Sequence, residues 1–332
     1  MPAQLFDNHG RQINYLRLAV TDRCNLRCFY CMPEEGINYV PRQELLTYEE
    51  MLRIIEVLVP LGISKVRLTG GEPFLRRDFM DFLRAIARID GLQKINLTTN
   101  GTLTAPHVPE LKKLGVSSVN LSIDSLDRER FHEITRRDSL PTVLETMEQL
   151  LAHDIDTKLN AVVMDGRNTE DIIPMVGLTK DQPLSVRFIE EMPFNGGDLH
   201  YETLAWNHRQ ILAHIQSAYP NLEKLPDPPN STASHYQIPG HQGNIGIIAA
   251  YSRTFCGSCN RIRITPKGML KTCLYDQGVL SLRDVLRAGA TDAQLADAFT
   301  STLQHRPVDG WEAQGRRPDD PEARESMATI GG

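Results

Sequence analysis

The sequence lacks several features that would place it in other classes of protein. It has no run of 18 apolar residues, so we expect no transmembrane helix. Residues 1–10 show neither the basic start nor the apolar stretch of a secretory signal, so we expect a cytoplasmic protein. A net charge of −6 disfavours general nucleic-acid binding. We therefore expect a globular protein with no membrane or nucleic-acid partner, in which a local basic pocket could still bind a small anion.

Cysteine is also scarce, at six residues in 332, which is too few for a disulfide scaffold. The six fall into two sets, at positions 24, 28 and 31 and at positions 256, 259 and 273. In a reducing compartment, clustered thiols more often bind metal or perform redox chemistry than form disulfides. The two sets are therefore the first candidates for a functional site.

Short β-branched runs alternate with helix-like apolar spacing through the first half of the chain. The predicted strands are Leu16–Thr21, Lys65–Thr69, Lys94–Thr98, Ser118–Ile123, Lys158–Val163 and Val186–Glu190. The predicted helices span residues 47–61, with a capping-box pattern at Thr47 and Glu50, and Arg77–Ile89, Asp127–Arg136, Pro141–His153 and Thr169–Val176. This alternation indicates βαβ units and a parallel sheet. Six strands are too few for a closed eight-stranded barrel, so we predict an α/β fold, an incomplete TIM-like barrel of about six βα units. A doubly wound sheet is the alternative.

The pattern changes after Met192, and we predict three regions. Residues 1–195 form the partial barrel, and residues 196–304 form a C-terminal α+β extension that closes its open side. The extension is expected to hold a helix at Trp206–Ala218, a loop at residues 226–230 and strands at Ile245–Ala250, Arg261–Ile264 and Met269–Thr272. Residues 305–332, rich in proline, glycine and charge, are expected to form a flexible tail that ends at Gly331 and Gly332.

The first cysteine set lies on a loop directly after the first predicted strand. Its spacing is C-x3-C-x2-C, at Cys24, Cys28 and Cys31, with no fourth cysteine nearby. Iron–sulfur clusters are usually held by four cysteines, so three would leave one iron open to a small molecule. A zinc knuckle with a distant fourth ligand is the alternative. The aromatic residue before Cys31 and the position at a strand end favour the cluster, because α/β barrels carry their active sites at that end.

This loop resembles the C-x3-C-aromatic-x-C signature of the radical S-adenosylmethionine (SAM) superfamily. The resemblance implies a [4Fe–4S] cluster whose open iron binds the amino and carboxylate groups of SAM. It also implies reductive cleavage of SAM to a 5′-deoxyadenosyl radical that abstracts hydrogen from a substrate. Gly70, Gly71, Glu72 and Pro73 at the end of the second strand are similar to the superfamily's GGEP motif, although Gly-Gly alone is a common turn.

Polar residues follow or interrupt the other predicted strands. Asn100 and Asp124 lie at strand ends, where they could line a barrel mouth or could serve as a turn and a helix cap. Lys158 and Arg187 lie among apolar neighbours in the fifth and sixth strands. A charge that faced the barrel interior would need a partner, so these cations indicate either a negatively charged substrate or a solvated edge.

The second cysteine set has the spacing C-x2-C-x13-C, at Cys256, Cys259 and Cys273, again without a fourth thiol nearby. A CxxC pair can also be a redox dithiol or half of a zinc site. Arg261 and Arg263 follow in strand-like alternation and share a face, where guanidinium groups suit phosphate binding. The set therefore indicates a second open-iron cluster beside a site for an anionic substrate with a nitrogen ligand, such as a nucleotide.

Together, the two cysteine sets, the GGEP stretch and the Gly-Gly terminus resemble the GTP 3′,8-cyclase family of molybdenum cofactor biosynthesis, from about Leu5 to the end of the chain. The resemblance implies cyclisation of GTP to (8S)-3′,8-cyclo-7,8-dihydroguanosine 5′-triphosphate, with SAM and two [4Fe–4S] clusters as cofactors. By resemblance, the first cluster is held by Cys24, Cys28 and Cys31 and the second by Cys256, Cys259 and Cys273. The implied SAM contacts are Tyr30, Gly71, Ser122 and Met192. The implied GTP contacts are Arg17, Arg67, Thr98, Lys158, Arg187, Arg261 and Arg263. The terminal Gly331 and Gly332 are expected to reach the active site, although a free terminus is the simpler interpretation.

The resemblance also implies partners: GTP, an external electron donor, and the next pathway enzyme, which makes cyclic pyranopterin monophosphate. We expect a monomer or homodimer. Two other hypotheses stay open at this point. One is a different radical SAM enzyme with an auxiliary cluster, for example one that modifies a peptide. The other is a non-enzymatic iron–sulfur or zinc protein.

Overall fold

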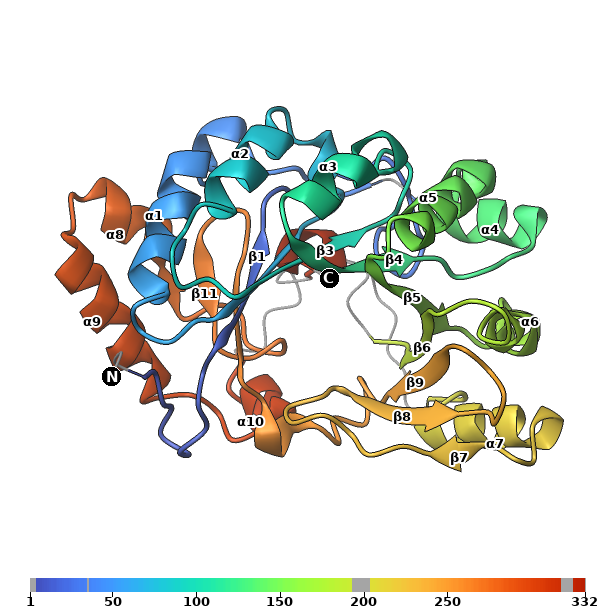
Figure 1. Cartoon of the computed structure of the whole chain (residues 1–332). Coiled ribbons are helices and arrows are strands. Elements are labelled where there is room, and N and C mark those ends of the chain that lie inside the picture. Colours follow the sequence, from blue (N-terminus) through green and yellow to red (C-terminus); the bar gives the residue numbers. More distant parts are fainter. Residues whose placement is uncertain (1–3, 35, 193–203, 318–324, 332) are drawn as a thin grey trace.

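The structure is a computed structural model that describes residues 4–34, 36–192, 204–317 and 325–331. These residues form one curved sheet of 12 strands in the order β12-β11-β10-β1-β2-β3-β4-β5-β6-β9-β8-β7. The pairs from β10 to β9 are all parallel, whereas β11 and β12 at one edge and β8 and β7 at the other are antiparallel. Figure 1 shows the sheet curving around a central space, with helices on its outer side.

The strands are β1 (Tyr15–Ala19), β2 (Lys65–Thr69), β3 (Lys94–Thr99), β4 (Val116–Ser122), β5 (Asp156–Val163), β6 (Ser185–Glu190), β7 (Glu223–Lys224), β8 (Ala233–Gln237), β9 (Asn244–Ile248), β10 (Arg261–Ile264), β11 (Met269–Lys271) and β12 (Leu280–Ser281). The helices are α1 (Tyr48–Leu58), α2 (Phe79–Ile86), α3 (Val108–Lys113), α4 (Arg128–Thr135), α5 (Leu140–Ala152), α6 (Ile172–Leu178), α7 (His208–Ala218), α8 (Leu282–Arg287), α9 (Asp292–Leu303), α10 (Gly310–Gly315) and α11 (Met327–Ile330). In this part of the chain, no helix is long and apolar enough to cross a membrane.

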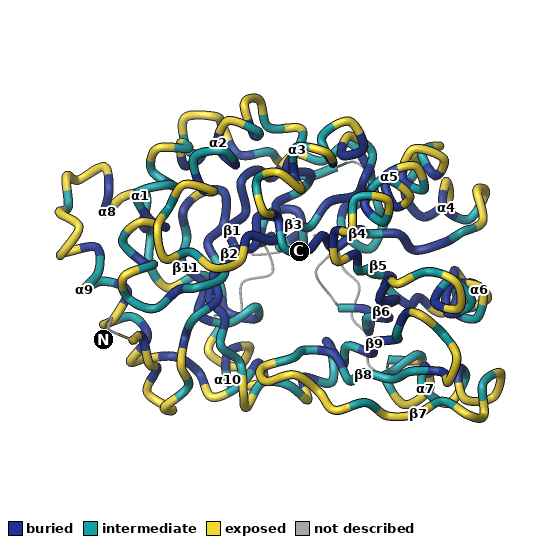
Figure 2. The backbone as a smooth tube through the Cα atoms, in the orientation of Figure 1, coloured by how far each residue is buried: buried dark blue, intermediate teal, exposed yellow. Residues whose placement is uncertain are grey.

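Alternation along the strands separates an apolar outer face from a polar inner face. In β1, Leu16 and Leu18 are fully buried in the core that α1 and α2 also line, while Tyr15 and Arg17 occupy the other face. A second core lies between strands β4–β6 and β9 and helices α4–α7. Figure 2 shows this division, with buried strands inside and exposed residues on the outer helices and loops. The core thus lies outside the barrel, and the lumen is free to carry polar groups.

The predicted partial barrel is confirmed. Strands β1 to β6 lie side by side in sequence order, so the doubly wound alternative, which requires the strand order to reverse, is wrong. The capping box at the start of α1 is present, since the Glu50 carboxylate accepts from the Thr47 amide at 2.8 Å and the Thr47 hydroxyl accepts from the Glu50 amide at 3.2 Å. The C-terminal extension adds to both edges of the barrel sheet, because β10 pairs with β1 and β9 pairs with β6.

The last part of the chain packs against the barrel. The described parts of residues 305–332 contain α10 and α11, and Ile330 is buried with Tyr275 and Ala313 in a small apolar cluster. In Figure 1 this end of the chain lies in the central space, near β3. Flexibility of this tail stays a prediction, as does the division into three regions. The predicted boundary at residues 195 and 196 and the terminal Gly332 fall outside the described residues.

Candidate functional site

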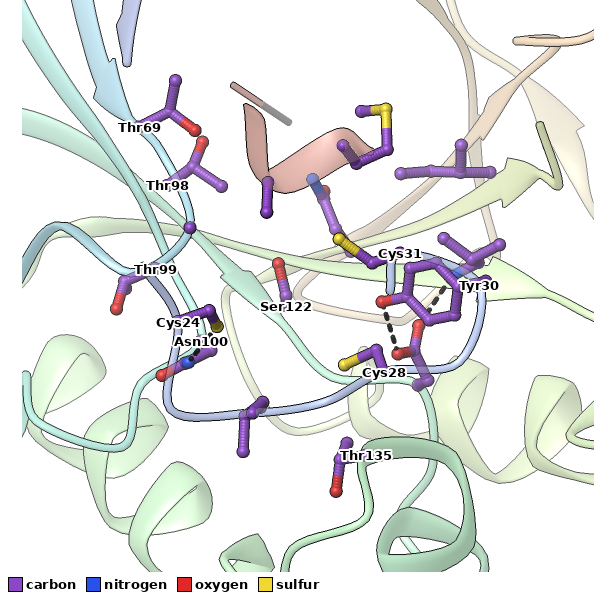
Figure 3. A pocket seen from close by; sticks show the side chains of 18 of the residues that line it. Cys24, Cys28, Tyr30, Cys31, Thr69, Thr98, Thr99, Asn100, Ser122 and Thr135 are labelled. Carbon is purple, nitrogen blue, oxygen red and sulfur yellow. Dashed lines mark hydrogen bonds between the residues drawn. The ribbon is translucent and has the colours of Figure 1, made fainter. Parts of the chain in front are cut away.

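The first cysteine set lines a cavity at the carboxyl ends of the barrel strands. Cys24, Cys28 and Cys31 lie on the loop after β1, and all three border one cavity of about 180 Å³ (Figure 3). All three are free thiols and only partly exposed. Three thiols on one short loop around one cavity fit the ligand set of an iron–sulfur cluster with an open position.

The glycine pair after β2 allows this loop to pack closely. A Cβ built on Gly71 would lie 2.3 Å from the Arg23 carbonyl oxygen, and one on Gly70 would lie 2.4 Å from that of Thr21. The Gly71 amide donates to the Thr21 carbonyl at 2.8 Å, and the Glu72 amide donates to the Arg23 carbonyl at 2.8 Å. No side chain fits at either glycine, so this pair fixes the position of the cysteine loop.

Two buried carboxyl groups hold the cavity wall: Glu72 of the GGEP stretch, and Asp124, which the sequence indicated as a residue that could line the barrel mouth. Burial raises the pKa of Glu72 to about 7, although that carboxylate accepts hydrogen bonds from the Asn100 amide at 2.7 Å and the Thr99 hydroxyl at 2.9 Å. The Asn100 side chain in turn donates to Cys24 Sγ at 3.5 Å. Glu72 thus reaches the first cysteine through one intermediate residue.

Asp124 plays a similar part on the opposite side of the cavity. Burial raises its pKa to about 6, and it accepts from the Tyr30 hydroxyl at 2.8 Å and the Val162 amide at 2.9 Å. Figure 3 shows Tyr30 beside Cys28 and Cys31. The predicted SAM contacts Tyr30, Gly71, Ser122 and Met192 all line this cavity, together with Thr98. The structure brings them together, and their role as ligand contacts stays a prediction.

The thiols of the first set are poorly suited to ionise on their own. Burial raises the pKa of Cys24 to about 12 and raises those of Cys28 and Cys31 as well. Nearby negative charge adds to the effect, from Glu72 at Cys24 and from Asp124 at Cys28. A metal centre would supply the missing positive charge, because thiolates are the ligating form and a bound cation deprotonates them.

A row of cations crosses the inner face of the sheet. Arg17 pairs in register with Arg263 on one side and Arg67 on the other. Tyr15, two residues before Arg17, pairs in register with Arg261 on one side and Lys65 on the other. Because side chains alternate between the two faces of a strand, Lys65 and Arg261 lie on the same face as Arg17. The predicted cationic residues Arg17, Arg67, Arg261 and Arg263 therefore lie together on one wall of the lumen.

The electrostatics of this lumen favour an anion. Burial, then the charge of Arg263, lowers the pKa of Arg17. At Tyr15 burial opposes ionisation, but the charges of Arg67, Arg17 and Lys65 outweigh it and lower the pKa of the phenol to about 7. The Tyr15 hydroxyl accepts from Arg67 Nε at 2.7 Å. Buried positive charge in this excess is costly unless a negative ligand joins it.

Lys158 and Arg187 extend the same field from β5 and β6. Burial, then the charge of Arg187, lowers the pKa of Lys158 to about 6, even though its ammonium contacts Asp156. Burial, then the charge of Arg67, lowers the pKa of Arg187 to about 10. Within the described part of the chain, the buried Nε atoms of Arg17 and Arg187 have no hydrogen-bond partner. The interpretation of Lys158 as a solvated edge residue is not favoured, because its side chain is only 15% exposed.

The second cysteine set lies at the β10 and β11 edge. Cys256 and Cys259 bracket a single turn before β10, and Cys273 follows β11 and packs against the small apolar cluster that contains Tyr275 and Ile330. Burial opposes ionisation of Cys259, but the charges of Arg261 and Arg306 outweigh it and lower the pKa of that thiol to about 6. Burial raises the pKa of Cys256, and it raises that of Cys273 to about 11. In this set, the charges of Arg261 and Arg306 thus favour the thiolate form of Cys259, which is the form that binds metal.

The C-terminal helix α11 touches both halves of the site. Met327 and Ala328 line the first cavity, and the Ser326 hydroxyl lies 3.8 Å from Cys31 Sγ. Arg263 Nη1 donates to the Gly331 carbonyl at 2.8 Å. A Cβ on Gly331 would lie 2.9 Å from the Ala19 Cβ, and the residue has φ +78°, so glycine is required on both grounds. The structure therefore places Gly331 against Arg263, and its part in an active site stays a prediction.

Sequence reasoning missed several members of the site. Tyr15 and Lys65 alternate with apolar residues in the same strands as Arg17 and Arg67, and that period-2 pattern could have revealed them. Arg306 carried no local signal. Across the described ranges, no three histidine, cysteine or acidic side chains converge closely enough to hold a single metal ion. An iron–sulfur cluster requires a different arrangement from a single-ion site, because each thiolate binds a different iron atom of the cluster.

Comparison with known proteins agrees with this architecture. The Radical SAM superfamily profile matches residues 18–178, and the Molybdenum Cofactor Synthesis C profile matches residues 184–310. The crystal structure of Streptococcus suis SuiB bound to S-adenosylmethionine superposes with a TM-score of 0.61 at 15% identity, covering 95% of this chain and 71% of SuiB. That likeness shows the shared fold. Membership of the radical SAM superfamily implies SAM and an iron–sulfur cluster as cofactors.

Curated relatives define the family more closely. Human molybdenum cofactor biosynthesis protein 1 is 44% identical over 294 residues, covering 88% of this chain and 46% of the human protein, so the chain spans about half the length of that relative. The GTP 3′,8-cyclase of Syntrophomonas wolfei is 40% identical over 94% of this chain and 98% of its own length. The mitochondrial GTP 3′,8-cyclase of Arabidopsis thaliana is 36% identical, covering 91% of this chain and 77% of that protein. The chain therefore belongs to the radical SAM superfamily and, within it, to the GTP 3′,8-cyclase family of molybdenum cofactor biosynthesis.

Proposed function

We propose that this chain converts GTP to (8S)-3′,8-cyclo-7,8-dihydroguanosine 5′-triphosphate, with SAM as the radical source and a [4Fe–4S] cluster at each cysteine set. The observation that carries the proposal is the row Arg263–Arg17–Arg67 on the inner face of the sheet. This row lies on strands that connect to both cysteine sets and presents to the lumen one buried guanidinium group, that of Arg67, and two partly exposed ones.

The first half of the site suits SAM. Cys24, Cys28 and Cys31 would hold one cluster, and the cavity they line is also lined by Gly71 and Ser122. When bound, the cluster and SAM supply the 5′-deoxyadenosyl radical that takes hydrogen from C3′ of the ribose. The chain's own contribution is to fix the loop through Glu72 and Asp124 and to enclose the cavity with Met192, which limits the access of water to a reactive species.

The other half suits a nucleoside triphosphate. A guanidinium group can donate two parallel hydrogen bonds to the oxygens of one phosphate, and Arg17, Arg67 and Arg263 offer three neighbouring guanidinium groups. Lys158 and Arg187 extend the cationic wall along β5 and β6. A triphosphate would neutralise these mutually repelling groups and would accept from the Nε atoms of Arg17 and Arg187, for which the described residues supply no acceptor.

Two anchors would hold the ribose in place. The cations fix the triphosphate, and Cys256, Cys259 and Cys273 would hold the second cluster, whose open iron would bind the guanine base. Fixing both ends of a substrate can remove roughly 7–11 kcal/mol from a barrier in favourable cases, because orientation is established on binding. An external electron donor and the next pathway enzyme, which makes cyclic pyranopterin monophosphate, complete the set of proposed partners.

The test uses the full chain, reconstituted anaerobically with iron and sulfide and reduced with dithionite. SAM is added with GTP, with guanosine or with neither, and 5′-deoxyadenosine and nucleotides are quantified by mass spectrometry. We expect 5′-deoxyadenosine to form in a GTP-dependent manner, together with a new nucleotide of the same mass as GTP. Guanosine should support far less, because it lacks the groups that the cations hold. Deoxyadenosine formation with GTP unchanged would retain the radical enzyme and refute the substrate.

A further inference from the structure

Arg306 is a buried cation between the second cysteine set and the N-terminus. It follows α9, and only 2% of its surface is exposed. Its Nη2 donates to Cys259 Sγ at 3.1 Å and to the Arg261 carbonyl at 2.9 Å. Its Nη1 donates to the Cys259 carbonyl at 2.8 Å and to the Asp7 carboxylate at 3.0 Å, and its Nε donates to the Thr272 carbonyl at 3.0 Å.

These contacts use every hydrogen that the side chain can donate. A guanidinium has five N–H groups, and the five bonds account for all of them. Two of the acceptors belong to Cys259, and Thr272 directly precedes Cys273. One side chain therefore fixes the backbone beside two of the three thiols and contacts the sulfur of one of them.

The N-terminal hairpin completes the arrangement from the other side. Asp7 also accepts from Arg11 Nε at 2.6 Å, and Arg11 Nη1 donates to the Cys256 carbonyl at 3.1 Å. Asp7 thus joins the cation that contacts Cys259 to the cation that contacts Cys256. Its carboxylate is fully buried, so it offsets part of the positive charge of Arg306.

The first cysteine set has a different surrounding. Among the described residues, the side chains that hydrogen-bond with its sulfurs at Cys24 and Cys31 are neutral, namely the Asn100 amide and the Ser326 hydroxyl. Hydrogen bonds and charge near the sulfurs set the reduction potential of an iron–sulfur cluster. The two sets therefore differ in the feature that controls the charge on the metal.

We propose that Arg306 is a positioning residue for the second cluster: it orients Cys259 and, through its hydrogen bond to Sγ and its charge, makes the cluster as a whole less negative and raises its reduction potential. Asp7 limits the size of this effect. The inference rests on the proposed second cluster, since it concerns the group that Cys256, Cys259 and Cys273 would hold. A less negative cluster would be a better acceptor, at its open iron, for a nitrogen or oxygen atom of the substrate.

The test measures the potential of the second cluster alone. The full chain carries Cys24→Ala, Cys28→Ala and Cys31→Ala, so that bound iron reports the second set. Dithionite supplies one electron to each oxidised cluster, and the reduced state is followed by electron paramagnetic resonance. We expect Arg306→Gln to shift the reduction equilibrium roughly tenfold toward the oxidised form, which is about 59 mV lower for a one-electron couple.

Two further variants test the direction and the size of the expected change in the reduction potential. Arg306→Lys keeps the charge but has three donors instead of five, so it should fall between Arg306→Gln and the parent chain. Asp7→Asn removes the offsetting charge and should raise the potential instead. Arg84→Gln, which removes an exposed cation of α2 paired with Asp81 and Glu110, is the matched control and should leave it unchanged.

The possible failures are distinguishable. If the parent chain binds no iron at the second set, the proposed function loses its second cluster. If iron binds and the potential of Arg306→Gln equals that of the parent chain, the inference about Arg306 is wrong. If Arg306→Gln fails to bind iron, Asp7→Asn decides the matter, because an unchanged or lower potential in that variant would overturn the inference.

Discussion

Removal of the Arg17 charge should stabilise the GTP-free protein and weaken GTP binding at the same time. Arg17 lies on the lumen face of β1 between Arg67 and Arg263; the residue is partly exposed, but its Nε is buried, and within the described residues no partner accepts from that atom. Without a ligand, repulsion from Arg263 and its neighbours and the cost of burial outweigh the attraction between its charge and Tyr15. Arg17→Met keeps much of the apolar volume and removes both.

The expected effects on stability and on GTP affinity have opposite signs. Replacement of buried charges by apolar side chains of similar volume often stabilises proteins by about 1–4 kcal/mol, and we expect the free energy of unfolding of GTP-free Arg17→Met to rise within that range. A hydrogen bond to a charged group contributes about 1.5–3 kcal/mol, so the loss of one guanidinium–phosphate contact should weaken GTP binding between about tenfold and about 150-fold.

The assay pairs denaturant unfolding with anaerobic equilibrium dialysis of GTP on the same preparations. Arg128→Met is the matched control, because Arg128 forms an exposed ion pair with Asp138, and such pairs contribute about 1 kcal/mol or less. Iron content should match the parent chain in both variants. A less stable Arg17→Met protein with unchanged GTP affinity would refute the assignment of the lumen to an anion.

Three other predictions follow from particular residues. The Lys158 ammonium has its pKa lowered to about 6, and a triphosphate would raise it again, so GTP binding should take up a proton and weaken as the pH rises above about 6. Calorimetry in buffers of different ionisation enthalpy measures this uptake, and its persistence in Lys158→Met would contradict the assignment. Gly71→Ala should lose the iron of the first set, because the new Cβ would overlap the cysteine-loop backbone, whereas Gly177→Ala on α6 meets nothing within 4 Å and should keep it; iron analysis separates the two. Deletion of Gly331–Gly332 should lower turnover at constant iron content, and normal turnover would remove the tail from the mechanism.

The barrel could be predicted from the sequence because its signals are local. Strands β1 to β6 follow a period-2 pattern. The apolar side chains on one face of each strand are buried only when the outer helices pack against them. The start of α1 is encoded by Thr47 and Glu50 within four residues. Helix α9 carries the same kind of signal, a capping box at Thr291 and Gln294, and could have been found. Strand β8, with the sequence Ala-Ser-His-Tyr-Gln, offers no such pattern and depends on its pairing with β9.

The site shows the same division between local and long-range information. Each cysteine motif is compact, and Arg261 and Arg263 follow directly after the second one. The alignment of Arg17 with Arg263 depends on parallel pairing between β1 and β10, which lie far apart in the chain. Arg306 lies 299 residues from Asp7, its partner in the ion pair, so nothing in either neighbourhood could predict the contact.

The central claim is that the radical formed at the first cysteine set takes hydrogen from GTP held in the cationic lumen. The most direct measurement gives the reduced, reconstituted chain SAM and GTP that carries deuterium at C3′, and then determines the mass of the 5′-deoxyadenosine produced. The account predicts that the deoxyadenosine gains one deuterium and that the cyclised nucleotide loses it. Deoxyadenosine without deuterium, formed while the nucleotide keeps its label, would contradict the account.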